Sequence, residues 1–133
     1  EFWEMLKKLK QQGITILVST PYMDEAMLCE RIALVQSGTI MDIDTPQNII
    51  RHFPEKLFGI KSNSMSRLLH DLRNNRHIKS CFAFGEYHHI TFKNNSEGES
   101  DLLMQDLHLR NHKETILKHI HPTIEDCFIN LMN

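Results

Sequence analysis

The pattern of apolar positions at the start of the chain predicts an amphipathic helix followed by a buried strand. Apolar residues recur there at i, i+3, i+4 and i+7, which is the one-sided stripe of a helix. The stripe consists of Phe2, Met5, Leu6 and Leu9. Gly13 is suited to the C-terminal end of this helix, and Ile14–Val18 is a β-branched run typical of a strand in a parallel sheet. Because no Ser, Thr, Asp or Asn caps the helix, we expect further sequence upstream.

Turn and capping residues divide the next stretch into a short helix, a hairpin and a second helix. We expect the short helix at 22–30, strands at 31–36 and 39–43, and the second helix from 45 to about 53. Ser37 and Gly38 give a hairpin turn signal between the two strands. Thr45 is suited to cap the second helix and Pro46 to occupy its first turn. Pro54 then marks a boundary.

The second half alternates strands and helices in an order that predicts a two-layer domain. In chain order we expect a strand at 56–62, a helix at 64–74, strands at 78–84 and 87–93, a helix at 101–110, a strand at 114–120 and a final helix at 124–132. The order β-α-β-β-α-β, which precedes the final helix, resembles that of ferredoxin-like domains. We therefore expect an α/β (α+β) chain with two domains, at 1–53 and 54–133.

The charge balance and the cysteines argue against several functional classes. The formal net charge is −2, so no strong basic field would attract nucleic acid or anionic lipid. Cys29, Cys81 and Cys127 are odd in number and form no CxxC pair, which argues against a disulfide framework or a zinc site. They fit a reducing, cytoplasmic environment, and no apolar run is long enough to span a membrane.

The nine histidines raise the question of a metal site, which their spacing does not support. His88 and His89 are adjacent in a predicted strand and therefore point to opposite faces of the sheet. His119 and His121 share a face but have no third ligand at a recognisable spacing. We interpret the histidines as surface or interface residues and expect no metal site.

Two segments of the chain resemble the ATP-binding subunits of ABC transporters. The first reads ILVSTPYMDEA at 16–26 and CERIAL at 29–34. It is similar to the succession of strand, switch loop, helix and hairpin entry in the family's nucleotide-binding core. The second segment reads PTIEDCFI at 122–129 and is similar to the PSLEDVFI close of some of these subunits. The YMDEA run resembles the subgroup that serves drug-efflux and ABC-2-type permeases.

The resemblance implies a fold and a function for the longer protein. Residues 1–53 would be the end of a P-loop ATPase core, followed by an accessory domain that is regulatory or contacts a dimer partner. The longer protein would bind ATP and Mg²⁺ and couple hydrolysis to multidrug export. Its partners would be a membrane permease and a second ATP-binding subunit, identical or different. It would lie in the cytoplasm, peripheral to the cell membrane.

The chain itself lacks the phosphate-binding parts of such an enzyme. It contains no G-x-x-x-x-G-K-[ST] loop, no Walker B aspartate–glutamate pair and no LSGGQ-type signature. These parts cradle the phosphates and hold the magnesium ion in P-loop ATPases. We therefore expect this chain alone neither to bind nor to hydrolyse ATP.

Ser19, Thr20, Pro21 and Tyr22 stand where the family has its nucleotide-proximal switch loop. Pro21 replaces the usual histidine and has neither donor nor charge, so we expect no catalytic residue in this chain. Two interpretations stay open: the ATP site has weakened or rerouted hydrolysis, or this subgroup tolerates proline and compensates elsewhere. A different class of function also stays open, namely a free-standing ferredoxin-like binding or regulatory module without an ATPase role.

Overall fold

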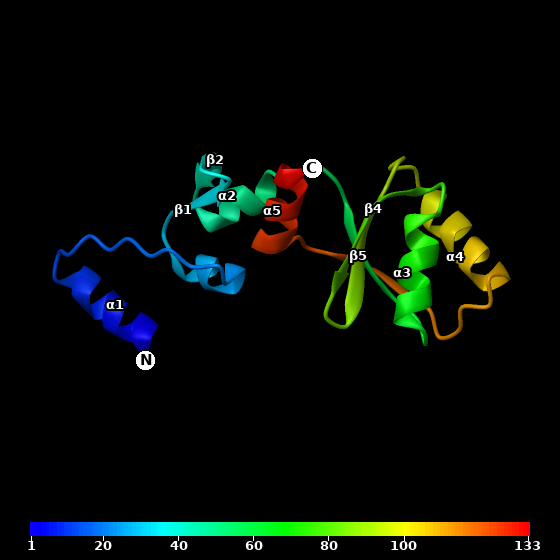
Figure 1. The fold of residues 1–133 in the computed structure, drawn as a ribbon, viewed down its shortest axis with the longest axis horizontal. Helices are drawn as coiled ribbons and strands as arrows, with labels where there is room; N and C mark the ends of the chain where they lie inside the picture. The colour runs from blue at the N-terminus through cyan, green and yellow to red at the C-terminus, as the bar shows by residue number, and fades with distance from the viewer. The chain divides into compact units, whose positions relative to one another are not determined.

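A computed structural model describes all 133 residues of the chain, which divides into two compact units (Figure 1). The first unit comprises Glu1–Phe53 together with Pro122–Asn133, and the second comprises Pro54–His121. Each unit has its own hydrophobic core. No helix in the structure combines the length and the apolar composition that crossing a bilayer requires.

The first unit contains one hairpin and four helical elements. In chain order they are α1 (Phe2–Gln11), the 3₁₀ helix η1 (Met23–Leu28), β1 (Ile32–Gln36), β2 (Thr39–Asp44), α2 (Pro46–Arg51) and α5 (Ile124–Met132). The turn between β1 and β2 has positive φ at both Ser37 (51°) and Gly38 (76°), as a two-residue hairpin turn requires. Thr45 caps α2 by accepting a hydrogen bond from the Asn48 N–H at 3.2 Å, as predicted.

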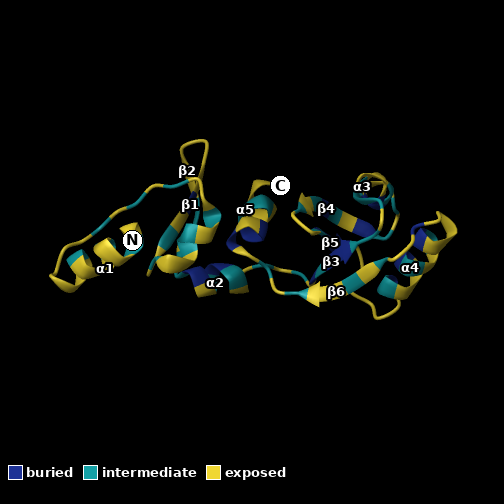
Figure 2. Ribbon diagram, turned by 90° about the horizontal axis from the view of Figure 1, so that it is seen from below, coloured by how far each residue is buried: buried dark blue, intermediate teal, exposed yellow.

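The core of the first unit joins the hairpin, α2 and α5. Leu34 of β1, Ile49 of α2, and Ile124 and Cys127 of α5 are all buried in one cluster. By contrast, α1 has no buried residue, as its colouring in Figure 2 shows. The expected domain boundaries assigned α5 to the second domain. In the structure α5 packs with the first unit, because Ile124 and Cys127 bury their side chains against the hairpin and α2.

The predicted strand at 14–18 does not form, and this prediction was wrong for the chain as it stands. The segment is extended, and the two sheets contain only strands from other parts of the chain. Leu17 has 97% of its surface exposed, although an apolar run of this kind is typical of a strand covered on both faces. A strand requires a hydrogen-bonding neighbour, and no other segment pairs with residues 14–18. The helix expected at 22–30 is the shorter 3₁₀ helix η1.

The second unit is a four-stranded antiparallel sheet with two helices. Its elements are β3 (Leu57–Lys61), α3 (Met65–Arg73), β4 (Ile78–Phe84), β5 (Tyr87–Phe92), α4 (Glu99–Leu109) and β6 (Ile116–Ile120). The strand order is β4-β5-β3-β6, and every neighbouring pair is antiparallel. Both sheets of the chain are therefore antiparallel, which agrees with an α+β fold.

Helices α3 and α4 cover one face of this sheet (Figure 1). Leu68 and Leu72 of α3 and Leu103 and Leu107 of α4 are at most 1% exposed, and they share a cluster with Ile60 of the central strand β3. The expected apolar face of α3 is thus a core face. The expectation that Leu102, Leu103, Leu107 and Leu109 of α4 all face the core was wrong for Leu102 and Leu109, which are 42% and 79% exposed. Burial of the core side chains supplies the main driving force for folding of the unit.

Candidate functional site

Ser19, Thr20, Pro21 and Tyr22 form an irregular segment between the extended run and η1. Thr20 is half-buried, and its hydroxyl oxygen accepts a hydrogen bond from the Tyr22 N–H at 3.0 Å. Ser19 and Pro21 are exposed, and 65% of the Tyr22 surface is exposed. We call residues 19–22 the switch segment. Its geometry is that of a solvent-facing loop held by one local turn.

Only one end of the switch segment is anchored in the first unit. The Glu25 N–H donates to the Tyr22 carbonyl at 3.1 Å, which ties the segment to η1. Met23 and Ala26 of η1 then pack against the buried cluster of the first unit. On the other side, residues 14–18 have no strand partner. The position of the segment is therefore set by the helix that follows it.

A network of carboxylates and amides joins the hairpin to α2 in the same unit. His52 Nδ1 lies 2.7 Å from Asp42 Oδ2. Asp44 Oδ1 accepts hydrogen bonds from the Asn48 side-chain amide at 3.0 Å and from the Thr45 N–H at 2.7 Å. The hydrogen bond from Asn48 and then that from Thr45 hold the pKa of Asp44 below its usual range. Hydrogen bonding to the charged form explains this direction, and the network fixes the start of α2.

The residues of the switch segment do not by themselves fit Mg-ATP. The segment contains no lysine, arginine or histidine. No group of three or more His, Cys, Asp or Glu side chains in the structure is arranged to hold a metal ion. Phosphate sites in P-loop ATPases require a glycine-rich loop and a lysine, and the sequence has neither in that arrangement.

Three histidines, His52, His77 and His112, lie within hydrogen-bonding distance of carboxylates, and His112 is buried. His112 Nε2 lies 2.6 Å from Asp71 Oδ2, and the side chain of His112 is fully buried. His77 Nδ1 lies 2.8 Å from Glu99 Oε2. The interpretation of all histidines as surface or interface residues is therefore wrong for His112. Asp71 lies 41 residues away from it in the chain, so no local sequence signal could have found the pair.

The adjacent histidines of β5 point to opposite faces, as predicted. His88 is buried at 5% exposure and its Nε2 lies 2.8 Å from the Met65 carbonyl oxygen of α3. His89 stacks on Phe84 with ring centroids 4.0 Å apart. The burial of His88 is a second departure from the surface interpretation. The rings of His119 and His121 lie 6.3 Å apart.

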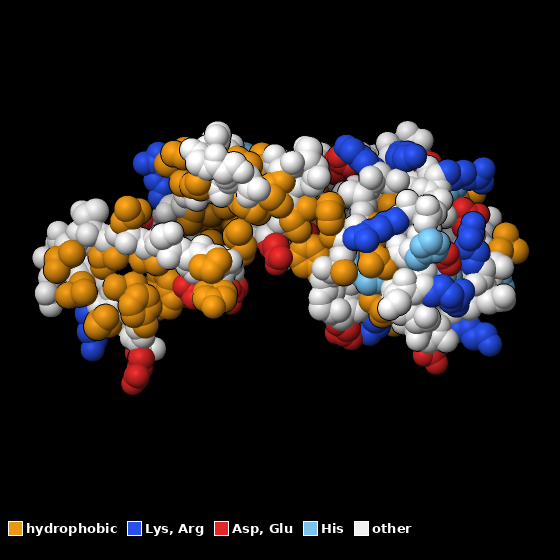
Figure 3. Space-filling model, viewed as in Figure 1, with side chains coloured by type: hydrophobic (Ala, Val, Ile, Leu, Met, Phe, Trp, Pro, Cys, Tyr) orange, Lys and Arg blue, Asp and Glu red, His pale blue; other side chains and the backbone are white.

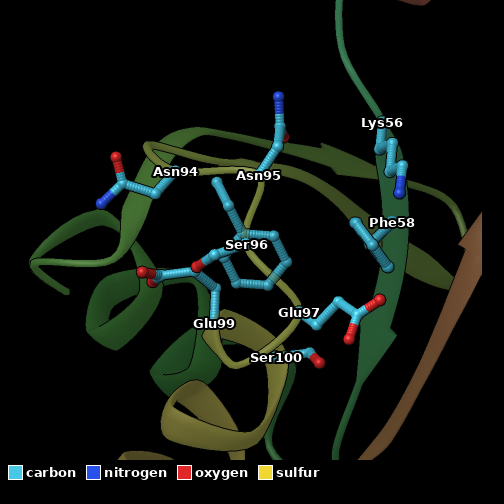
Figure 4. Close-up of a pocket in the computed structure, with 9 residues that line it drawn as sticks. Lys56, Phe58, Asn94, Asn95, Ser96, Glu97, Glu99 and Ser100 are labelled. Carbon is cyan, nitrogen blue, oxygen red and sulfur yellow. The ribbon is translucent and has the colours of Figure 1, made fainter.

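A small pocket lies in the second unit between β3 and the loop that precedes α4. Figure 4 shows Phe58 on β3 and Lys56, just before the strand, on one side of the pocket, with Asn95, Ser96 and Glu97 of the loop on the other. The pocket holds about 90 Å³, whereas ligand pockets commonly hold roughly 300–1,000 Å³. It is therefore too small for a nucleotide.

Comparison with known proteins confirms the resemblance of this chain to ABC transporter ATP-binding proteins. No protein-family model matches the chain. The "Probable multidrug ABC transporter ATP-binding protein YbhF" of Escherichia coli (strain K12) is 39% identical over 49 residues, which are 37% of this chain and 8% of that protein.

Two further relatives carry ATP-binding names. The "Energy-coupling factor transporter ATP-binding protein EcfA1" of Clostridium novyi (strain NT) is 35% identical over 71 residues, which are 52% of this chain and 25% of that protein. The "ATP-binding cassette sub-family A member 7" of Rattus norvegicus is 34% identical over 73 residues, 53% of this chain and 3% of that protein. The matched segments thus span a quarter or less of each of these three relatives.

Proposed function

We propose that this chain is the carboxyl-terminal part of the ATP-binding subunit of an ABC-type, multidrug-exporting transporter. The longer protein would couple ATP binding and hydrolysis to export through a membrane permease. The similarity to three ABC ATP-binding proteins supports the class, and the name of one of them supports multidrug export.

The single observation that carries the proposal is the unpaired apolar segment before the switch segment. Residues 14–18 are apolar and extended, and no strand pairs with them. Leu17 is 97% exposed, and hydrophobic side chains gather on the visible face of the first unit (Figure 3). Single exposed apolar residues are common, but a strand-like run that has no pairing partner and exposes both Ile14 and Leu17 is not typical of a covered core strand. The neighbouring strands of a parallel ATPase sheet would cover it.

Amide hydrogen exchange tests this proposal directly. In the chain as it stands, the amides of Thr15–Val18 should exchange nearly as fast as those of an unfolded peptide. In a protein extended upstream through the phosphate-binding loop, the same amides should be protected at least about a hundredfold, as in a central strand. Equal, fast exchange in both proteins would contradict the assignment of residues 14–18 to a buried core strand.

For the second unit we propose a ferredoxin-like accessory domain that regulates the ATPase or contacts the second ATP-binding subunit. Its order of strands and helices and its sheet order β4-β5-β3-β6 support that topology. A fold of this kind hosts many functions, so the regulatory role rests on its place in the chain. The accessory part would begin near Pro54, where the sequence boundary was expected.

The cofactors, partners and location of the longer protein are part of the same proposal. ATP and Mg²⁺ would bind to parts that this chain does not contain. The protein would pair with a second ATP-binding subunit and dock from the cytoplasm on a permease in the cell membrane, without binding nucleic acid. This chain alone would be inactive as an ATPase.

Pro21 bears on how the longer protein would hydrolyse ATP. We propose that this switch segment supports weak or rerouted hydrolysis, because Pro21 offers no donor where the family has histidine. Replacing Pro21→His in the longer protein should raise kcat, with Pro21→Ala as the control for loss of the proline ring. An unchanged kcat in Pro21→His would instead favour compensation elsewhere in the site.

One observation favours a second candidate function, a free-standing binding module. The second unit has a complete antiparallel sheet and its own buried core. Such a module would not require the first unit for folding. It would also leave the similarity to ATP-binding proteins without a role, which is why we place it second.

A further inference from the structure

We propose that helix α5 positions the switch segment by holding η1 against the core of the first unit. This inference rests on the proposed function for its meaning, because it concerns regulation of the same segment. The packing itself is independent of that function. It makes Ile124 and Cys127 positioning residues that act through η1.

Helix α5 packs directly on η1. Ile124 and Cys127 are 3% and 4% exposed, and both belong to the buried cluster of the first unit. Met23 and Ala26 of η1 pack against that cluster. Helix α5 contacts both η1 and α2, so it is a main support of the six-residue η1.

Hydrogen bonds connect η1 to the switch segment. The Glu25 N–H donates to the Tyr22 carbonyl at 3.1 Å, and the Tyr22 N–H donates to Thr20 Oγ1 at 3.0 Å. Two consecutive hydrogen bonds therefore connect η1 to Thr20. Because residues 14–18 have no strand partner in this chain, no sheet contact holds the segment from the other side. A shift of η1 would carry Tyr22 with it.

A capping box fixes the start of α5. Thr123 and Asp126 form a capping box. Thr123 Oγ1 accepts from the Asp126 N–H at 3.2 Å, and Asp126 Oδ2 accepts from the Thr123 N–H at 2.8 Å. The box orders the first turn of α5, which is the turn that carries Ile124 and Cys127. The core residues Ile124 and Cys127 therefore lie in the turn that the capping box orders.

A short chain connection joins α5 to the second unit. Strand β6 ends at Ile120 and α5 begins at Ile124, so three residues separate them. One of these is Pro122, whose ring restricts the backbone. A change in the second unit would reach α5 through this short connection and then reach the switch segment through η1. Under the proposed function, this connection is the route by which the second unit would act on the switch segment.

Amide exchange and thiol alkylation in the present chain test the packing. The variant Ile124→Val removes one methyl group from the core, and Phe128→Leu reduces a side chain that packs against the same cluster. Each should speed exchange of the amides at 23–29 by about fivefold and speed alkylation of Cys29 by iodoacetamide. Leu131→Ala is the matched control, because Leu131 lies on α5 but is 39% exposed, and it should change neither rate.

The exchange rates at 23–29 decide whether α5 holds η1. Faster exchange at 23–29 in both core variants, with the second unit unchanged, supports it. If the α5 amides exchange faster while those at 23–29 keep their rate, α5 does not hold η1 and the inference is overturned. A variant that unfolds the whole first unit would also speed exchange in the hairpin. In that case the milder Ile124→Val is compared with Ile49→Val, a core change outside α5, which should affect 23–29 less.

Steady-state kinetics of the longer protein separate positioning from plain stability. Ile124→Val should lower kcat for Mg-ATP severalfold and leave KM unchanged, because the phosphate-binding residues lie elsewhere. Phe128→Leu should retain more of kcat than Phe128→Ala. Equal losses in kcat and in the amount of folded protein would contradict a positioning role. If the longer protein fails to bind Mg-ATP while the exchange result holds, the proposed function fails and the packing inference stands.

Discussion

The buried pair of His112 and Asp71 offers a sharp test of how the second unit is held together. The side chain of His112 is fully buried and that of Asp71 is 10% exposed. His112 Nδ1 has no hydrogen-bond partner, so the bond of 2.6 Å between Nε2 and Asp71 Oδ2 is the main polar contact of the ring. It joins α3 to the loop after α4. We consider the variants His112→Leu, Asp71→Leu and the double variant.

The expected magnitudes follow from what each variant leaves unpaired. His112→Leu leaves the Asp71 carboxylate in a buried site with Arg110 at 3.8 Å as its remaining charge partner. Breaking a buried pair from one side commonly costs about 3–5 kcal/mol. A domain of this size has a total stability of about 3–10 kcal/mol, so each single variant should be close to unfolding. The double variant leaves neither group unpaired, so it should lose no more stability than either single variant, which corresponds to a coupling energy of at least about 3 kcal/mol.

Urea unfolding followed by far-ultraviolet circular dichroism measures these energies. Tryptophan fluorescence would not report on the pair, because Trp3 lies in the first unit. Glu86→Gln is the control, since it breaks a pair with Lys61 in which the Glu86 side chain is 72% exposed, and its effect should be far smaller. Strictly additive losses in the double variant would refute a direct interaction between His112 and Asp71.

The buried cysteines, the cap of α2 and the Asp44 carboxylate can each be tested separately. Burial raises the pKa of Cys81 and of Cys127 to about 11, so at pH 8 iodoacetamide should modify both thiols far more slowly in the folded chain than in urea. Because unfolded thiols ionise at lower pH, stability should fall as pH rises from the ordinary thiol range toward 11; a flat profile would contradict this. Thr45→Ala should destabilise the first unit by about 1 kcal/mol in thermal unfolding, whereas Thr45→Ser should not. The lowered pKa of Asp44 contributes stability above the ordinary carboxyl range that is lost as pH falls through the lowered value, and Asn48→Ala should shift acid unfolding to higher pH.

Local signals in the sequence predicted the elements of the structure well. Thr45 and Pro46 begin α2, and Ser37 and Gly38 form the hairpin turn, because capping and turn residues act over a few bonds. The order of strands and helices in the second unit also agrees with the prediction. Periodicity identified the buried side of α3, which packs on the sheet. In α4 it identified Leu103 and Leu107, whereas Leu102 and Leu109 are exposed although they are also apolar.

Features that depend on distant partners could not be predicted. Residues 14–18 read as a strand, but a strand forms only where a neighbour supplies hydrogen bonds, and this chain supplies none to them. The place of α5 in the first unit depends on its contacts with Leu34 and Ile49, which are far away in sequence. The buried histidines were missed for the same reason, because their partners come from other elements. The assignment of residues 19–22 as a switch segment rests on resemblance alone and stays a prediction.

Calorimetric titration with Mg-ATP tests whether the chain is the carboxyl-terminal part of an ATP-binding subunit. Two proteins are compared: this chain, and the same sequence extended upstream through its phosphate-binding loop. We expect no detectable heat of binding for the chain and saturable binding to the extended protein. If neither protein binds Mg-ATP, the proposal of an ABC ATP-binding subunit is contradicted, and the second unit becomes the part whose ligand must be sought.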